Sequence, residues 1–147
     1  FIAVAKKMPN VQFIHIGKWT NNKGIPCETM IRYDKKISSP NIQYLGHVNT
    51  EVLRQYYLES KVYLQLSRHE AFGISVVEAM SYNCTPIVTN SYALPEIVKL
   101  NGIVVKSLTD IIHNIKSVLL LESNIISYAF ISKYSVRKRR DSFKKII

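Results

Sequence analysis

Acidic side chains are scarce in this sequence, and aspartate is the scarcest. Its 147 residues contain 20 Lys and Arg against 10 Asp and Glu, a formal net charge of +10 at pH 7. The three aspartates, Asp34, Asp110 and Asp141, stand far apart, so no Asp-x-Asp pair exists. Enzymes that hold Mg²⁺ beside a phosphate need carboxylates close together. The sequence therefore predicts no metal site.

Cysteines and long apolar runs are scarce too. Cys27 and Cys84 are far apart and lack metal-ligand spacing, so we interpret both as reduced thiols, with Cys84 in the core. No run of about 18 apolar residues could span a membrane, and the first residues lack a signal-peptide layout. With 47% hydrophobic residues and no repeat, residues 1–147 are expected to form a single domain.

The most informative stretch combines a strand, a turn and a helix. The apolar run Val62–Leu66 is typical of a buried strand, and the polar turn Ser67–Glu70 follows it. Gly73 then opens a helix whose apolar residues recur at near-helical spacing: Ile74, Val77 and Met80. The first N–H groups of a helix have no partners within it, so this arrangement indicates an anion-binding end.

Two carboxylates frame that turn: Glu70 precedes the helix, and Glu78 lies within it. A carboxylate near the helix start can accept two hydrogen bonds from a sugar diol. The plainer interpretation is that Glu70 caps the helix and Glu78 is a solvated surface residue, and for either residue alone it is the favoured one. The combination of both glutamates with Phe72 and Gly73 favours a ligand site.

Strands and helices alternate along the chain. Expected strands cover 11–16, 42–45, 62–66, 87–89 and 103–105, and expected helices cover 1–8, 27–36, 50–58, 73–82, 94–100, 107–121 and 136–147. This alternation predicts an α/β fold with a parallel sheet. Ligands bind beyond the carboxyl ends of such strands. The loops there are expected to share one rim: Gly17, Gly46, Ser67–Gly73, Asn90–Leu94 and Lys106.

The motif Ser67-x-x-Glu70-x-Phe72-Gly73-Ile74-x-x-x-Glu78-Ala79 resembles the paired-glutamate signature of the group 1 glycosyltransferases, a retaining family with the two-domain GT-B fold. Further segments resemble other family elements in the same order: Leu45–Val48, Thr85–Val88, Leu94–Val98 and Asn101–Gly102. The resemblance implies a Rossmann-like, doubly wound parallel sheet that forms the C-terminal half of a GT-B enzyme.

The resemblance also implies a role for each matched residue. Glu70 is the expected catalytic residue at the donor sugar, and Glu78 is expected to hold the ribose hydroxyls. The donor sugar and diphosphate are expected to meet Ser67, Phe72, Gly73 and Ile74. Beside the nucleotide base we expect Gly46, His47 and Val48. No cofactor is implied, because the donor is itself a nucleoside diphosphate sugar.

The chain departs from the family pattern in three places. Ala71 stands where a second glycine is common, and Tyr92-Ala93 where Gly-Gly is frequent. The family's first strand–helix unit, which carries a diphosphate-clamping Arg and Lys, is expected to precede Phe1, as is the N-terminal domain. We therefore expect the fragment alone to be inactive. Without that first strand, direct pairing of 11–16 with 62–66 is the favoured arrangement, because it needs no partner chain. The alternatives are a strand inserted by a neighbouring chain and an open gap that makes the fragment prone to aggregate.

The implied reaction transfers a glycosyl group of hexosyl type from the sugar nucleotide to an acceptor hydroxyl with retention of configuration. The acceptor, a glycan or a lipid-linked sugar, would be bound by the N-terminal domain. A non-catalytic sugar-nucleotide-binding module, or an inactive remnant, is the alternative.

The basic run Arg137–Arg140 with Lys144-Lys145 is a second feature that indicates a partner. It suggests contact with an anionic membrane surface. Nucleic acid is disfavoured, since no aromatic stacking motif accompanies the run. The expected location is cytoplasmic, at the inner face of the membrane.

Overall fold

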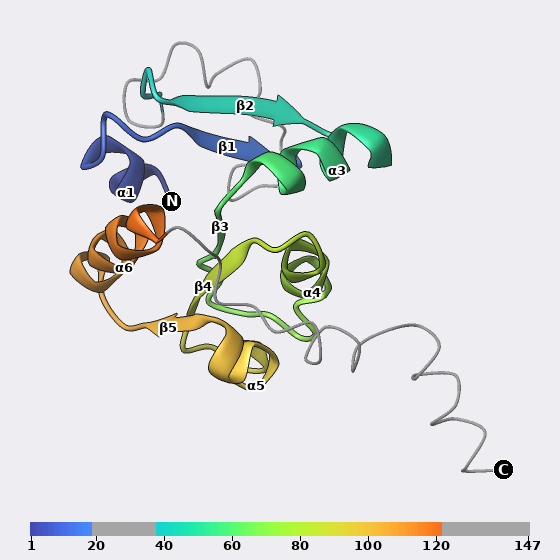
Figure 1. Ribbon diagram of the computed structural model, residues 1–147, viewed down its shortest axis with the longest axis vertical. Coiled ribbons are helices and arrows are strands. Elements are labelled where there is room, and N and C mark those ends of the chain that lie inside the picture. The colour runs from blue at the N-terminus through green and yellow to red at the C-terminus, as the bar shows by residue number, and fades with distance from the viewer. Residues whose placement is uncertain (19–37, 122–147) are drawn as a thin grey trace, which may run out of the picture. The chain divides into compact units, whose positions relative to one another are not determined.

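The computed structural model describes residues 1–18 and 38–121 (Figure 1). By backbone proximity the chain divides into two compact units, Phe1–Tyr56 and Tyr57–Ile147. The division falls within α3 (Thr50–Glu59).

The first unit is built on two parallel strands. β1 (Phe13–Ile16) pairs with β2 (Ile42–Gly46), and α1 (Ile2–Lys6) precedes them. The buried Asn41 amide joins these parts, because its Nδ2 donates to the carbonyls of Ala5, Met8 and Val11 at 2.9–3.0 Å. A buried carbonyl without a donor is costly, so this one side chain stabilises both the end of α1 and the start of β1.

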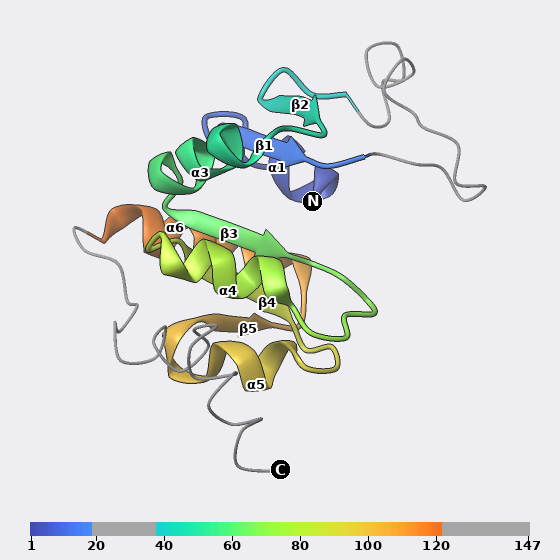
Figure 2. The same ribbon diagram turned by 90° about the vertical axis from the view of Figure 1, so that its right-hand side faces the viewer.

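The second unit is a three-layer sandwich. Its parallel sheet has the order β3–β4–β5, from β3 (Val62–Gln65), β4 (Thr85–Thr89) and β5 (Ile103–Val105). α4 (Ile74–Ser81) and α5 (Leu94–Val98) cover one face, and α6 (Leu108–Leu120) covers the other (Figures 1 and 2). A short 3₁₀ turn, η1 (Lys99–Asn101), follows α5.

β4 lies at the centre of this unit, so its side chains are buried on both faces from Thr85 to Val88. One cluster joins β4 to α4 and α5 through fully buried or nearly buried side chains: Val76, Met80, Val88, Leu94, Ile97 and Val98. Strands buried on both faces read as near-continuous apolar runs, and in β4 that run is Pro86 to Val88, with a threonine at either end.

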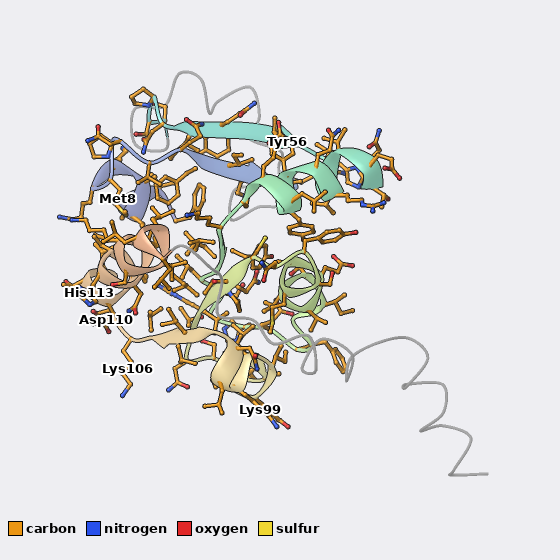
Figure 3. The ribbon with its side chains drawn as sticks, viewed as in Figure 1. Met8, Tyr56, Lys99, Lys106, Asp110 and His113 are labelled. Carbon is orange, nitrogen blue, oxygen red and sulfur yellow. The ribbon has the colours of Figure 1, made fainter. Side chains whose placement is uncertain are left out.

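Helix ends follow the local signals in the sequence. Asn49 Oδ1 accepts from Val52 N at 2.9 Å at the start of α3. Asn83, with φ of +66°, follows the end of α4. Ser107 and Asp110 form a reciprocal capping box that begins α6, next to Lys106 (Figure 3). Each signal lies within a few residues of the end that it defines.

The α/β architecture, the parallel strands and most element bounds confirm the sequence prediction. The helices expected at 27–36 and 136–147 lie outside the described residues. The ladders among the described strands, β1–β2, β3–β4 and β4–β5, each lie within one unit. Pairing of 11–16 with 62–66 would join the two units, and it stays a prediction.

Candidate active site

The Glu70 carboxylate lies at the N-terminal end of α4. Its Oε1 accepts a hydrogen bond from the Gly73 amide at 3.0 Å and a longer one from the Phe72 amide at 3.4 Å. Its Oε2 accepts from Nε2 of Gln65 at 3.0 Å. The turn and helix therefore gather backbone donors around the Glu70 carboxylate itself, which is the contact expected where Glu70 caps the helix.

Gly73 makes this turn possible in two ways. Its φ of +57° and ψ of +37° lie in the left-handed region, which a side chain disfavours. A Cβ at this position would also lie 2.8 Å from Cδ1 of Ile97 and 3.3 Å from Cδ2 of Leu94. The turn can therefore approach α5 closely because residue 73 has no side chain.

Ser67 connects the loop after β3 to the end of β4. Its Oγ accepts from Nε2 of Gln65 at 2.7 Å, and its carbonyl accepts from Oγ1 of Thr89 at 2.6 Å. Gln65 and Thr89 are the last residues of their strands. The two loops are therefore fixed to each other at the carboxyl edge of the sheet, where parallel α/β folds bind ligands.

The side chains of Phe72 and Ile74 are 77% and 57% exposed, so they do not contribute to the core. In the loop after β4, Tyr92 is 72% exposed and has a φ of +48°, which is strained for an aromatic residue. Its hydroxyl lies 3.2 Å from Nδ1 of His69, and the two rings are 5.4 Å apart. This pair forms a second connection between the loops after β3 and β4.

Glu78 lies on the exposed part of α4, and both it and Glu70 affect the pKa of the half-buried Tyr63. Burial is the main cause that raises the pKa of the Tyr63 hydroxyl. A hydrogen bond with the Ser75 side chain opposes the shift, and the negative charges of Glu70 and Glu78 add to it. Glu78 also adds to the rise in the pKa of Tyr57, which is caused chiefly by burial. Both glutamates thus act on one phenol.

The residues expected beside the base belong to the first unit. Gly46 ends β2 with a φ of +64°, and its carbonyl accepts from the Gly17 amide at 2.7 Å. His47 is exposed and Val48 is half-buried. The expected donor-sugar, diphosphate and ribose residues, Ser67 to Glu78, belong to the second unit.

Sequence reasoning missed Gln65, Thr89 and Tyr63, which surround the predicted site residues. The signal was present in part, because Gln65 is a polar residue in the otherwise apolar run Val62–Leu66. A polar side chain at the carboxyl end of a buried parallel strand is a candidate for the ligand edge of the sheet.

Over residues 1–18 and 38–121, His, Cys, Asp and Glu side chains nowhere gather in groups of three that could hold a metal ion. Within the same residues, no helix combines the length and apolar character needed to cross a bilayer.

Comparison with known proteins identifies the family. The sequence model of the glycosyl transferases group 1 matches residues 2–135. The O-antigen chain mannosyltransferase B of Escherichia coli is 36% identical over 63 residues, which cover 43% of this chain and 16% of that protein. The matched segments span 18% or less of the curated relatives.

Solved structures agree on the fold. The pneumococcal O-GlcNAc transferase GtfA, in complex with UDP and GlcNAc, superposes with a TM-score of 0.71 at 20% identity, over 99% of this chain and 30% of that one. The C-terminal domain of the group 1 glycosyl transferase LpcC from Francisella tularensis gives 0.62 at 21% identity, over 99% of this chain and 74% of that one. This chain belongs to the group 1 glycosyltransferases, and its fold is that of the GT-B class.

Proposed function

We propose that residues 1–147 form one sugar-nucleotide-binding domain of a retaining glycosyltransferase. The enzyme transfers a hexosyl group from a nucleoside diphosphate sugar to an acceptor hydroxyl on a glycan or lipid-linked sugar. Family membership supports the reaction class. The relatives include a mannosyltransferase and a transferase solved with UDP and GlcNAc, which supports a nucleotide sugar as donor.

The observation that carries this proposal is the position of the Glu70 carboxylate on the amides of Phe72 and Gly73. With Gln65 as the third donor, three hydrogen bonds reach a group that offers about four acceptor sites. The remaining site can accept a hydrogen bond from a hydroxyl of the donor sugar. Glu70 is therefore assigned to the donor sugar as an oriented acceptor, not as a nucleophile.

The diphosphate is assigned to the first turn of α4. After Phe72 and Gly73, the N–H groups of Ile74 and Ser75 follow in a turn where a helix supplies no carbonyl partners. Backbone donors and the helix dipole stabilise the negative charge that develops on the leaving diphosphate, so the step needs no metal ion. The Ser67 hydroxyl oxygen accepts a hydrogen bond from Gln65, so the O–H of Ser67 can still donate a hydrogen bond to the sugar nucleotide.

The nucleoside is assigned to the remaining predicted residues. The exposed Glu78 can accept two hydrogen bonds from the ribose diol. The backbone of Gly46, His47 and Val48 is assigned to the base, a role that depends on residues 1–147 forming one domain.

Titration calorimetry of the chain tests this function. The ligands are UDP-glucose, UDP-N-acetylglucosamine, GDP-mannose and ADP-glucose, with UDP, GDP and ADP as sugar-free counterparts. Glu78→Ala is expected to weaken the binding of a sugar nucleotide and of its sugar-free counterpart alike, by about tenfold, which corresponds to the loss of one hydrogen bond to a charged group. Glu70→Gln is expected to weaken the binding of the sugar nucleotide alone.

Glu59→Ala is the matched control, because Glu59 is also an exposed helical glutamate. It is expected to leave every affinity unchanged. The proposed function is wrong if the unmodified chain binds none of these ligands. It is also wrong if Glu59→Ala lowers the affinities as much as Glu78→Ala does.

Contact with the cytoplasmic face of a membrane is a separate part of the proposal, and it rests on the basic residues 137–145. These residues lie outside the described part of the chain. Co-sedimentation with anionic and with neutral vesicles at two salt concentrations tests it. Salt-sensitive binding to anionic vesicles alone is the expected result, and equal binding to both vesicle types contradicts it.

A further inference from the structure

The oxygen and both N–H groups of the Gln65 side-chain amide have hydrogen-bond partners. Its Oε1 accepts from the Tyr63 hydroxyl at 3.0 Å. Its Nε2 donates to Oγ of Ser67 at 2.7 Å and to Oε2 of Glu70 at 3.0 Å. A primary amide has two N–H donors, and both are engaged here. One side chain thus connects a phenol on β3 to two residues of the adjacent loop.

This network fixes which way the amide of Gln65 faces. A carboxylate accepts hydrogen bonds and cannot donate them when ionised, so the nitrogen of Gln65 must face Glu70. The opposite orientation would place the amide oxygen against the Glu70 carboxylate. The Tyr63 hydroxyl helps to hold the observed orientation, since it is tied in turn to the side chain of Ser75 on α4.

The two oxygens of Glu70 therefore have different partners. Oε1 faces the α4 amides of Phe72 and Gly73, and Oε2 faces Gln65. A carboxylate bound only by the two amides could still rotate about its own side-chain torsions. A donor on the other oxygen, supplied from a rigid strand, limits that rotation.

We propose that Gln65 is a positioning residue of the donor site, which acts by setting the orientation of the Glu70 carboxylate. This inference rests on the proposed function, in which Glu70 contacts the donor sugar. Gln65 acts through Glu70, so its loss is expected to reduce the affinity for the sugar part of the donor and not for the nucleotide part.

A purely structural role is the competing explanation, because Gln65 also contacts Ser67. In that case Gln65 would merely hold the loop, and any substitution that keeps the fold would act equally on nucleotides and sugar nucleotides. The two explanations differ in ligand selectivity and in dependence on pH.

Two substitutions separate these explanations. Gln65→Leu removes the donor, and Gln65→Glu replaces it with an acid that can be charged or neutral. Near pH 8 two adjacent carboxylates repel each other, whereas near pH 5.5 they can share one proton, which restores a donor between them. The matched control is Gln43→Leu, an exposed glutamine on β2.

The first measurement needs no ligand. Hydrogen exchange of the Phe72 and Gly73 amides, followed by NMR, reports whether Glu70 stays on the end of α4. Gln65→Leu is expected to speed exchange at these amides about tenfold, while the amides in the core of β4 keep their wild-type rates. Unchanged exchange at Phe72 and Gly73 would overturn the positioning role whatever the ligand does.

The second measurement is affinity for the best-binding sugar nucleotide of the calorimetric panel, and for its sugar-free nucleotide. Gln65→Leu is expected to bind the sugar nucleotide about tenfold more weakly at every pH, with nucleotide affinity and the Gln43→Leu control unchanged. The affinity of Gln65→Glu for the sugar nucleotide is expected to be reduced near pH 8 and to recover near pH 5.5. Each affinity is compared with that of the wild type at the same pH.

Each other outcome contradicts the inference in its own way. Equal loss for nucleotide and sugar nucleotide, or the absence of recovery by Gln65→Glu, would make Gln65 a structural tie. If Glu70→Gln lowers the affinity for the sugar nucleotide and Gln65→Leu does not, the proposed function stands and the proposed role of Gln65 is refuted. If the wild type binds no ligand of the panel, the proposed function fails and this inference fails with it.

Discussion

Gly73 illustrates how much a single residue contributes to the geometry of the candidate site. Its left-handed backbone disfavours a side chain, and a Cβ there would displace the flexible tips of Ile97 and Leu94. We expect Gly73→Ala to lower the free energy of unfolding by about 1–3 kcal/mol, chiefly from backbone strain, with overpacking as the smaller cause. Urea denaturation monitored by circular dichroism measures the loss.

Gly46→Ala is the control that separates the two causes. Gly46 also has a positive φ, of +64°, but a Cβ there would meet nothing within 4 Å. Its substitution is expected to cost about 1 kcal/mol, from strain alone. Equal losses for the two variants would show that the contact with Ile97 does not matter.

His15 provides a prediction about pH. Its ring lies 5.9 Å from that of Phe1 and 5.6 Å from that of Tyr44. Burial lowers the pKa of His15 below its ordinary value of 6.5, and a backbone hydrogen bond opposes the shift. Below that value the unfolded chain binds a proton that the folded chain does not. Stability is therefore complete above pH 6.5 and is expected to fall as the pH drops below it.

The measurement is the urea midpoint near neutral pH and at about pH 5.5. His15→Gln is expected to reduce the difference between the two midpoints, since it removes the titrating group. His113→Gln, at an exposed position on α6 (Figure 3), should leave the difference as it is. A wild-type midpoint that rises on acidification would refute the sign of this prediction.

At the scale of the element, α6 is the helix whose start is best defined. Ser107 Oγ accepts from Asp110 N at 3.1 Å, and Asp110 Oδ2 accepts from Ser107 N at 3.1 Å. Since α6 covers one face of the sheet, loosening its first turn should weaken the second unit. Ser107→Ala is expected to cost about 1 kcal/mol in thermal or urea unfolding.

Ser117→Ala tests the same change inside the same helix. The Ser117 hydroxyl donates to the His113 carbonyl at an exposed position, which adds little to stability. Because alanine is the better helix former, this variant should be unchanged or slightly more stable. If Ser117→Ala costs as much as Ser107→Ala, the capping explanation is wrong.

At the scale of the whole molecule, we expect this chain alone not to turn over sugar nucleotides. The segments that match curated relatives span 18% and 16% of those proteins, and a glycosyl transfer also needs an acceptor site. The loss of one transition-state contact costs about 3 kcal/mol, and several are expected to be absent together. The measurement is release of nucleoside diphosphate from each sugar nucleotide, with Glu70→Ala as background. Release above that background would contradict the expectation.

Much of this architecture could be predicted from local sequence. The strand at 62–65, the helix at 74–81 and the cap at Ser107 all appear within one or two residues of the predicted bounds. Their signals are apolar spacing and capping residues, which act over a few positions. Pairing between strands depends on the path of the whole chain, so no local signal in the sequence selects the ladders β1–β2, β3–β4 and β4–β5.

The candidate site divides in the same way. The sequence alone determined that a strand, a polar turn, Gly73 and a helix follow one another, with Glu70 before that helix and Glu78 on it. Chain connectivity and helical spacing suffice for that. The tertiary structure decided that Gln65 donates to Glu70, that Thr89 holds the Ser67 carbonyl and that Tyr92 meets His69. The first contact depends on the shape of the turn between β3 and α4, and the other two depend on how the loops after β3 and β4 fold back toward each other. No short-range periodicity encodes either geometry.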